Sequence, residues 1–181
     1  IMKVVYCCYG GTHSSVVTAS IHLGMLPSDK IPSSFEIERL PYYDKVEPNE
    51  IGTPFFMGKD ELGCEVYIIG MINQKQVVKK AIKSFLENSG IDTEDLLMIN
   101  TLGNVNIVTK FGGFISRRLG LVKVGRQLTI WGIRQKYFDF VRLAQEVKKD
   151  LGSKLNLDFK DVFGNNSDSS KQKKASLYRK R

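Results

Sequence analysis

The first 24 residues combine an apolar run, a pair of glycines and an amphipathic stretch. Residues 4–8 have β-branched, aromatic and cysteine side chains, a composition typical of a buried strand. The glycines at positions 10 and 11 suit a tight turn. Residues 14–23 carry apolar side chains at helical spacing, and Gly24 is suited to end a helix. The segment therefore predicts a strand, a tight loop and a helix, in that order.

Strand-like and helix-like segments alternate through the rest of the sequence. Ser33 and Glu36 are spaced as a capping box, which predicts a short helix over residues 34–40. Two strand-like runs around a glycine-containing turn predict a β-hairpin. The predicted strands are residues 54–57, 64–69, 96–99 and 128–131, and the predicted helices are residues 77–86, 107–115 and 137 to about 152.

This alternation favours a three-layer α/β fold with helices on both faces of a mostly parallel sheet. We expect about five strands, a flavodoxin-like or Rossmann-like arrangement, and the hairpin as an insertion. The pattern predicts one domain over residues 1–163 and a basic, disordered tail over residues 164–181.

The net charge of +8 is unevenly distributed. Residues 166–181 hold six basic residues and one acid, so they contribute +5 and the rest of the chain only +3. The tail could contact nucleic acid or a protein, but a solvated terminus is the simpler interpretation. No apolar run approaches the roughly 20 residues that cross a membrane, so no membrane insertion is expected.

The three cysteines, two of them adjacent, make a poor disulfide framework. Reduced thiols indicate a cytoplasmic protein. No group of Cys, His or Asp residues has the spacing of a metal site, and no cofactor motif is present, so neither a metal nor a cofactor is expected.

The loop of residues 8–15 is the candidate site, because α/β sheets bind ligands at the carboxyl ends of their strands. Free N–H groups and the helix dipole favour an anion there, most often phosphate. The same field favours a thiolate at Cys8, the candidate nucleophile, and His13 is the candidate acid or base. The candidate ligand-binding residues of the loop are Gly10, Gly11, Thr12, Ser14 and Ser15.

Each of these residues also has a structural interpretation. Gly10 and Gly11 could form only a tight turn, and Cys8 could be a small core residue. Cys7 is expected in the core, and His22, in the middle of a helix, is expected to be structural. The loop itself holds no acid to pair with His13, which favours a non-catalytic ligand-sensing or regulatory module over an enzyme.

Further candidates follow the other predicted strands. Asn73, Asn100, Thr101 and Asn104 could bind a polar ligand or cap the following helices. The loop lacks a cationic side chain. Arg117, Arg126 and Arg134 are equal candidates to supply one, although a cation near a helix end is often explained by the dipole alone.

Three known phosphate loops can be compared with residues 8–15. A Walker P-loop requires a GxxxxGK[ST] motif, and this loop has no lysine, which argues against an ordinary P-loop NTPase. The spacing resembles the Cys-x5-Arg-Ser loop of low-molecular-weight tyrosine phosphatases, with Ser14 in place of the arginine. Cys8, Gly11, Ser14 and Ser15 also match the cysteine loop of sugar-phosphotransferase IIB domains. These resemblances imply cysteine-dependent phosphoryl transfer or hydrolysis.

A wider resemblance covers residues 2–150. It is carried by the stretches at residues 6–15, 21–24, 56–60 and 112–120. With these motifs the chain resembles an uncharacterised domain-of-unknown-function family from spore-forming bacteria. The resemblance implies a bacterial cytoplasmic protein and no particular activity. The sequence therefore predicts a protein that binds a phosphorylated or other anionic small molecule.

Overall fold

A computed structural model describes residues 1–101 and 122–155 of the 181-residue chain. Internal contacts divide the chain into two units, Ile1–Ala144 and Gln145–Arg181. The whole sheet and the loop of residues 8–15 belong to the first unit. The predicted tail of residues 164–181 and its boundary lie outside the described residues.

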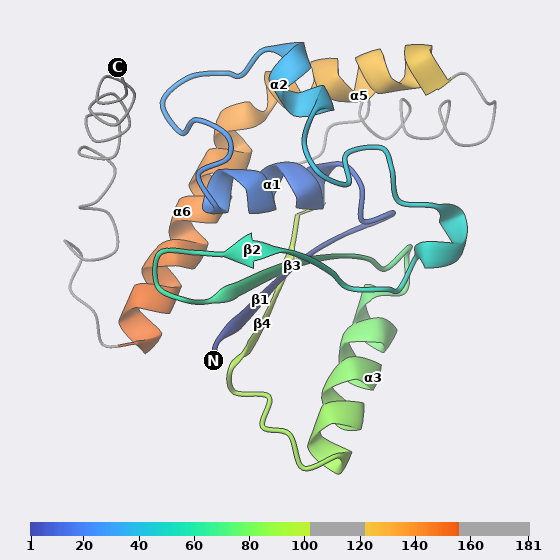
Figure 1. The fold of residues 1–181 in the computed structure, drawn as a ribbon. Helices are drawn as coiled ribbons and strands as arrows, with labels where there is room; N and C mark the ends of the chain where they lie inside the picture. The colour runs from blue at the N-terminus through green and yellow to red at the C-terminus, as the bar shows by residue number, and fades with distance from the viewer. Residues whose placement is uncertain (102–121, 156–181) are drawn as a thin grey trace, which may run out of the picture. The chain divides into compact units, whose positions relative to one another are not determined.

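The described elements confirm an α/β fold (Figure 1). None of the described helices is both long and apolar enough to cross a membrane. In chain order the elements are β1 (Lys3–Cys8), α1 (Ser14–His22), α2 (Ser34–Glu38), the 3-10 helix η1 (Pro48–Glu50), β2 (Phe55–Lys59), β3 (Glu65–Gly70), α3 (Lys75–Asn88), β4 (Leu96–Asn100), α5 (Val122–Gln135) and α6 (Tyr137–Lys154).

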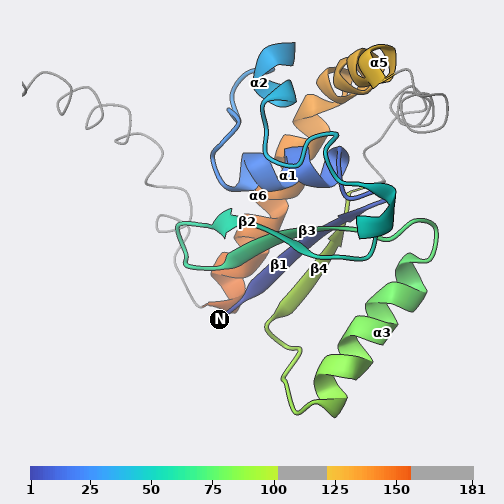
Figure 2. The ribbon, with the colours of Figure 1, turned by 45° about the vertical axis from the view of Figure 1, so that its right-hand side comes forward.

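The sheet is mixed and has the strand order β2-β3-β1-β4 (Figure 2). Strand β1 pairs in parallel with β3 on one side and with β4 on the other. Strand β2 pairs antiparallel with β3, which confirms the predicted hairpin. The three parallel strands therefore present their carboxyl ends at one edge of the sheet.

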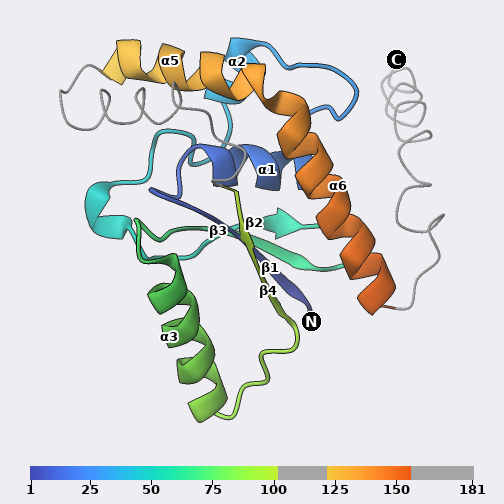
Figure 3. The same ribbon diagram turned by 180° about the vertical axis from the view of Figure 1, so that it is seen from behind.

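Alternate residues of β1 face opposite layers. The hydroxyl of Tyr6 contacts His22 of α1 at 2.7 Å. Val5 and Cys7 face the other way, into a cluster against which Val78 and Ile82 of α3 pack. Helices α1 and α3 accordingly lie on opposite faces of the sheet (Figure 3). Cys7 is fully buried, in agreement with its predicted place in the core.

Helix termini follow the predicted signals at two places. The side chain of Ser33 accepts a hydrogen bond from the N–H of Glu36, and the Glu36 carboxylate accepts one from the N–H of Ser33, which completes the capping box of α2. Gly24, just beyond α1, has a φ of 67°, a conformation that glycine adopts without steric cost.

The strand predicted at residues 128–131 is wrong, because these residues lie within helix α5. Thr129, Ile130 and Ile133 are buried, whereas Trp131 is 51% exposed. Burial at positions i, i+1 and i+4 is helical, since a strand would place Thr129 and Trp131 on the same face. The helix predicted at residues 107–115 lies outside the described part of the chain.

A buried polar chain joins α1 to the hairpin. Nε2 of His22 lies 3.0 Å from Oδ2 of Asp60, and Nδ1 of the same ring lies 2.7 Å from the Tyr6 hydroxyl. Oδ1 of Asp60 accepts hydrogen bonds from the N–H groups of Leu62 and Cys64 in the hairpin turn. His22 is the last residue of α1 rather than a mid-helix residue, and its surroundings agree with the predicted structural role.

Candidate functional site

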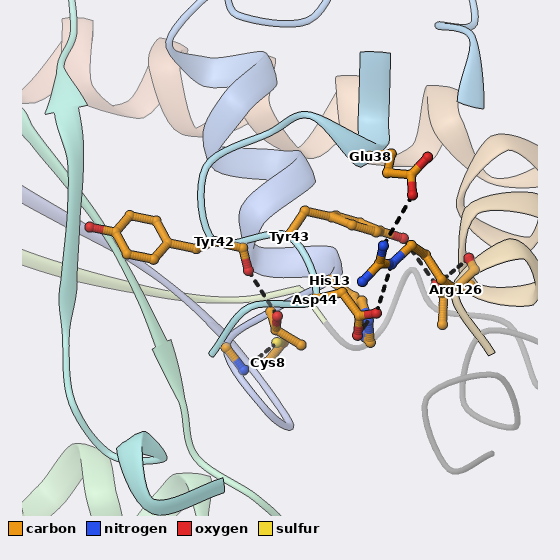
Figure 4. A network of polar contacts seen from close by, with 10 residues as sticks. Cys8, His13, Glu38, Tyr42, Tyr43, Asp44 and Arg126 are labelled. Carbon is orange, nitrogen blue, oxygen red and sulfur yellow. Dashed lines mark hydrogen bonds and ion pairs between the residues drawn. The ribbon is translucent and has the colours of Figure 1, made fainter. Parts of the chain in front are cut away.

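The loop of residues 8–15 lies where the strand order of the sheet reverses. Strand β1 is flanked by β3 on one side and by β4 on the other, and all three run parallel. Ligands of α/β sheets bind beyond the carboxyl ends of the strands at such a reversal. The loop joins the end of β1 to the start of α1, so it occupies this position (Figure 4).

Glycines hold this loop against the neighbouring strand. Gly11 has a φ of 72°, and a Cβ atom there would lie 2.7 Å from the backbone nitrogen of Gly70. A Cβ atom on Gly70 would lie 2.7 Å from the carbonyl carbon of Gly10. No side chain fits between the loop and the end of β3. The close backbone approach at Gly10 and Gly11 is thus made to β3.

The thiol of Cys8 faces the turn that follows it. The N–H of Gly11 donates a hydrogen bond to Sγ at 3.0 Å, and the Ser15 hydroxyl lies 3.1 Å from the same atom. The sulfur therefore accepts one backbone hydrogen bond beside the start of α1. Cys8 is only 3% exposed, and within the described chain no hydrogen bond joins it to His13.

Thr101 is brought beside the first turn of α1. Its hydroxyl donates to the carbonyl oxygen of Cys7 at 3.0 Å and lies 2.9 Å from the Ser14 hydroxyl. Because the Thr101 proton is used on Cys7, the Ser14 hydroxyl must be the donor to Thr101. Thr101 and Ser14, both predicted as site residues, therefore meet where β1 and β4 end.

Residues 42–44 lie against the other side of the loop. The Thr12 hydroxyl donates to the carbonyl oxygen of Tyr42 at 2.9 Å, and the N–H of Asp44 donates to the carbonyl oxygen of Thr12 at 3.2 Å. The loop is consequently held on one side by β3 and on another by this segment.

Three residues next to the loop have strained backbones. Tyr42, Asp44 and Ile72 have φ values of 61°, 57° and 46°, and they are the only non-glycine residues with positive φ in the described part of the chain. All three are hydrogen-bonded to the loop, since the N–H of Ile72 donates to the carbonyl oxygen of Tyr9 at 2.9 Å. Such conformations persist only where the surroundings enforce them, and they concentrate at functional sites.

A chain of charged groups extends from His13 to helix α5 (Figure 4). Nε2 of His13 lies 3.2 Å from Oδ1 of Asp44. Nε of Arg126 donates to Oδ2 of Asp44 at 3.0 Å, and its Nη1 donates to Glu38 at 3.1 Å. The His13 ring also packs edge-on against Tyr43, with ring centroids 5.3 Å apart. These contacts fix both the ring of His13 and the carboxylate beside it.

His13 and Arg126 determine the charge of Asp44. Burial by itself raises the pKa of this carboxyl group, but the hydrogen bonds and charges of His13 and Arg126 outweigh that effect and lower the pKa below its ordinary value. Asp44 is therefore ionised at neutral pH. This acid corrects the expectation that His13 has no acidic partner. The sequence held no local signal for it, because the two residues are 31 positions apart.

The remaining predicted residues have varied positions. Arg126 approaches the site but is bound to two carboxylates. Arg134 is exposed in the last turn of α5, where the helix dipole favours a cation, and no strand end lies there. Asn73 is exposed and precedes Gln74, the N-cap of α3, so it does not cap that helix itself. Asn100 is the exposed last residue of β4. Asn104 and Arg117 lie outside the described residues.

Residues 1–101 and 122–155 contain no cluster of three or more His, Cys, Asp or Glu side chains that could hold a metal ion. The chemistry that the described site offers is therefore that of a thiol, hydroxyls, backbone N–H groups and a histidine paired with an acid.

Comparisons with known proteins give one match. A family model described as "Protein of unknown function (DUF3189)" matches residues 3–149. No curated protein and no solved structure matches the chain. The matched residues include the loop of residues 8–15 and the described charged groups around it.

Proposed function

The chain belongs to this family of unknown function, DUF3189, and we propose that it binds a phosphorylated or other anionic small molecule at the loop of residues 8–15. The family match confirms the predicted resemblance to an uncharacterised domain-of-unknown-function family. Because the family brings no activity, the proposal rests on the chemistry of the loop.

The strain around the loop carries the proposal. Each of Tyr42, Asp44 and Ile72 costs on the order of 1–3 kcal/mol in its conformation, and each is hydrogen-bonded to the loop. A loop that only turned the chain would not require three strained neighbours. The N–H groups at the start of α1 and the hydroxyl of Ser15 are groups that recognise an anion, whereas the Ser14 hydroxyl donates its proton to Thr101.

Backbone N–H groups, rather than an arginine side chain, would bind the negatively charged ligand. The guanidinium of Arg126 is bound to Asp44 and Glu38, and Ser14 stands where phosphatase loops of similar spacing have arginine. Recognition by the helix N-terminus and hydroxyls requires no cationic side chain.

Cysteine-dependent phosphoryl transfer or hydrolysis is the second candidate. Two observations favour it: the N–H of Gly11 donates to the Cys8 sulfur, and His13 is paired with Asp44. The Cys8 sulfur would form the bond to phosphorus as the bond from phosphorus to the departing oxygen breaks, and an imidazolium form of His13 would give that oxygen its Nδ1 proton. The 3% exposure of Cys8 favours the alternative, a non-catalytic ligand-sensing or regulatory module.

Three broader expectations belong to the same proposal. The strand order β3-β1-β4 supports a flavodoxin-like or Rossmann-like arrangement. The resemblance of the sequence supports a bacterial, cytoplasmic protein from a spore-forming organism. The positive charge of residues 165–181 supports contact with nucleic acid or protein. If so, deletion of these residues should abolish salt-sensitive binding to that partner.

Thermal unfolding with inorganic phosphate tests the binding proposal. Phosphate should raise the Tm of the wild-type protein, and the rise should be smaller in Ser15→Ala, which lacks the hydroxyl beside Cys8. Ser20→Ala is the matched control, because Ser20 is buried on the same helix and its hydroxyl has no partner within the described residues. Its response to phosphate should equal that of the wild type.

An equal loss in Ser15→Ala and Ser20→Ala, or no effect of phosphate on the wild type, would contradict the proposal. Cys8→Ser then separates the two candidates. Phosphate stabilisation that survives in this variant, together with no hydrolysis of p-nitrophenyl phosphate by the wild type, indicates a binding module. Hydrolysis by the wild type that Cys8→Ser abolishes indicates the cysteine-dependent reaction.

A further inference from the structure

We propose that Asp44, held in place by Arg126, is a positioning residue that keeps the proton of neutral His13 on Nε2 and leaves Nδ1 as a hydrogen-bond acceptor of the anion site. The role of Nδ1 rests on the proposed function, whereas the position of the ring proton is a property of the free protein. The two parts can therefore be tested separately.

The position of Asp44 is fixed from several directions. Its side chain is only 5% exposed, and its two oxygens are divided between two partners, with Oδ1 3.2 Å from His13 and Oδ2 3.0 Å from Nε of Arg126. The guanidinium is anchored in turn by Glu38 at 3.1 Å. The backbone N–H of Asp44 is bonded to the carbonyl oxygen of Thr12, so the carboxylate cannot move away from the loop without breaking this bond.

The ring of His13 is held as firmly as the carboxylate. Its side chain is 14% exposed, and the ring packs edge-on against Tyr43. The hydroxyl of Tyr43 lies 3.1 Å from that of Thr129 in α5, which fixes the aromatic ring in turn. A flip of the imidazole would disturb this packing and the bond to Asp44.

The chemistry of the pair determines the tautomer. An ionised carboxylate only accepts hydrogen bonds, so the nitrogen that faces Asp44 must carry a proton. Neutral imidazole has one N–H, and it is therefore on Nε2 while Nδ1 has a free lone pair. When hydrogen phosphate binds, its O–H group can donate a hydrogen bond to Nδ1, while the N–H on Nε2 stays paired with Asp44. A buried acid that holds a histidine in one tautomer is a general way of preparing it as a base.

Asp44→Asn should reverse the tautomer. Arg126 can only donate hydrogen bonds, so the amide oxygen of Asn must face the guanidinium and the amide NH2 must face His13. The NH2 then donates to Nε2, and the ring proton moves to Nδ1. In the double variant Asp44→Asn with Arg126→Met, the amide is free to turn either way, and we expect a mixture of both tautomers.

Nitrogen-15 NMR of the imidazole rings measures this directly, because the chain has only two histidines. The wild type should show a protonated Nε2 and an unprotonated Nδ1 at His13, and Asp44→Asn should show the reverse. The other buried pair, His22 with Asp60, is the matched control: Asp60→Asn should alter the His22 signals and leave those of His13 unchanged. Unchanged His22 signals in Asp44→Asn show that the variant is folded.

A wild-type His13 with its proton on Nδ1, or an Asp44→Asn spectrum like that of the wild type, overturns the positioning role. Phosphate and sulfate titrations test the acceptor role: at pH 7 the wild type should prefer inorganic phosphate, whose O–H can donate to Nδ1, over sulfate, which has no O–H, and Asp44→Asn should reduce this preference several-fold, up to about tenfold, because its Nδ1 carries the proton. An equal preference in the two proteins overturns that role. Absence of phosphate binding to the wild type overturns the proposed function, while the tautomer measurement still decides the role of Asp44.

Discussion

Nε2 of His22 lies 3.0 Å from Oδ2 of Asp60, and neither side chain has any exposure to solvent. This pair resembles that of His13 and Asp44 in its atoms but differs in its surroundings. The other nitrogen of His22 is bonded to Tyr6, and Asp60 also accepts hydrogen bonds from the hairpin backbone. Every polar atom of the His22 ring is therefore used within the fold, which indicates a structural role.

The first prediction concerns the stability that this pair provides. Asp60→Ala removes the partner of His22 and leaves the N–H groups of Leu62 and Cys64 without their acceptor. Breaking a buried pair of this kind costs about 3–5 kcal/mol. Urea unfolding at pH 7 should show a loss of this size.

Asp92→Ala is the control for that experiment. Asp92 also accepts a backbone hydrogen bond in a turn, from the N–H of Glu94, but it is exposed. Its replacement should change the free energy of unfolding by less than about 1 kcal/mol. If Asp60→Ala and Asp92→Ala lower the free energy of unfolding by similar amounts, the buried pair stabilises the fold no more than an exposed turn hydrogen bond does.

The second prediction is the pH dependence of the same contribution. Burial by itself raises the pKa of Asp60, but hydrogen bonds from His22 and from the N–H groups of Cys64 and Leu62 outweigh it and lower the pKa below its ordinary value. A folded-state pKa below the unfolded value of about 3.9 means that Asp60 stabilises the fold fully above about pH 4 to 5, and that this stability is lost as pH falls through the folded pKa.

The measurement is the free energy of unfolding of the wild type and of Asp60→Asn between pH 3 and 7. The difference between the two proteins should be constant from pH 5 to 7 and should shrink as the pH falls toward 3. A difference that grows with falling pH would reverse the sign of the linkage and contradict the assignment of Asp60 as an ionised group in the fold.

Local sequence patterns predicted the sheet well but misplaced one strand. The runs that became β1, β3 and β4 are bounded by glycines or polar residues and pair in parallel as expected. Residues 128–131 have the same β-branched and aromatic composition, yet they form part of α5. Short apolar runs do not distinguish a strand from a buried helix, and the helical pattern appears only when Ile133 is read together with Thr129 and Ile130.

In the candidate site too, the sequence predicted the contiguous residues but not those that are far apart in the chain. The loop of residues 8–15 could be located because its glycines, cysteine and hydroxyls are contiguous. Asp44 and Glu38 could not, since only the folded chain brings them to His13 and Arg126. Pairings over such separations depend on the path of residues 28–53, a stretch with few regular elements and little periodicity to read.

The third prediction concerns the contact between the loop and β3. In Gly70→Ala the new Cβ atom would meet the carbonyl carbon of Gly10 at 2.7 Å, so the loop must shift. We expect a loss at the upper end of the roughly 1–3 kcal/mol that overpacking costs, and a loss of phosphate stabilisation. Gly90→Ala separates this clash from backbone strain, because Gly90 has a φ of 73° but open space around it. It should cost about 1–2 kcal/mol and leave the response to phosphate unchanged.

The fourth prediction is that iodoacetamide modifies Cys8 before the other two cysteines. All three are buried to a similar degree, with exposures of 0% for Cys7, 3% for Cys8 and 2% for Cys64, so their rates compare chemistry more than access. Burial raises the pKa of Cys7 to about 12 and, together with the charge of Asp60, that of Cys64 to about 11. At pH 8, roughly one Cys64 thiol in a thousand is then the reactive thiolate.

Peptide mass spectrometry after timed alkylation at pH 8 measures the three rates in one sample. Cys8 should react fastest, because the N–H of Gly11 and the Ser15 hydroxyl surround its sulfur, and inorganic phosphate should slow it by occupying the same donors. Ser15→Ala should lower the rate at Cys8, whereas Ser20→Ala should not. A rate at Cys8 no higher than at Cys64 would contradict a reactive thiolate at Cys8 and therefore the cysteine-dependent reaction. Anion binding by the loop is tested separately, by the phosphate titration.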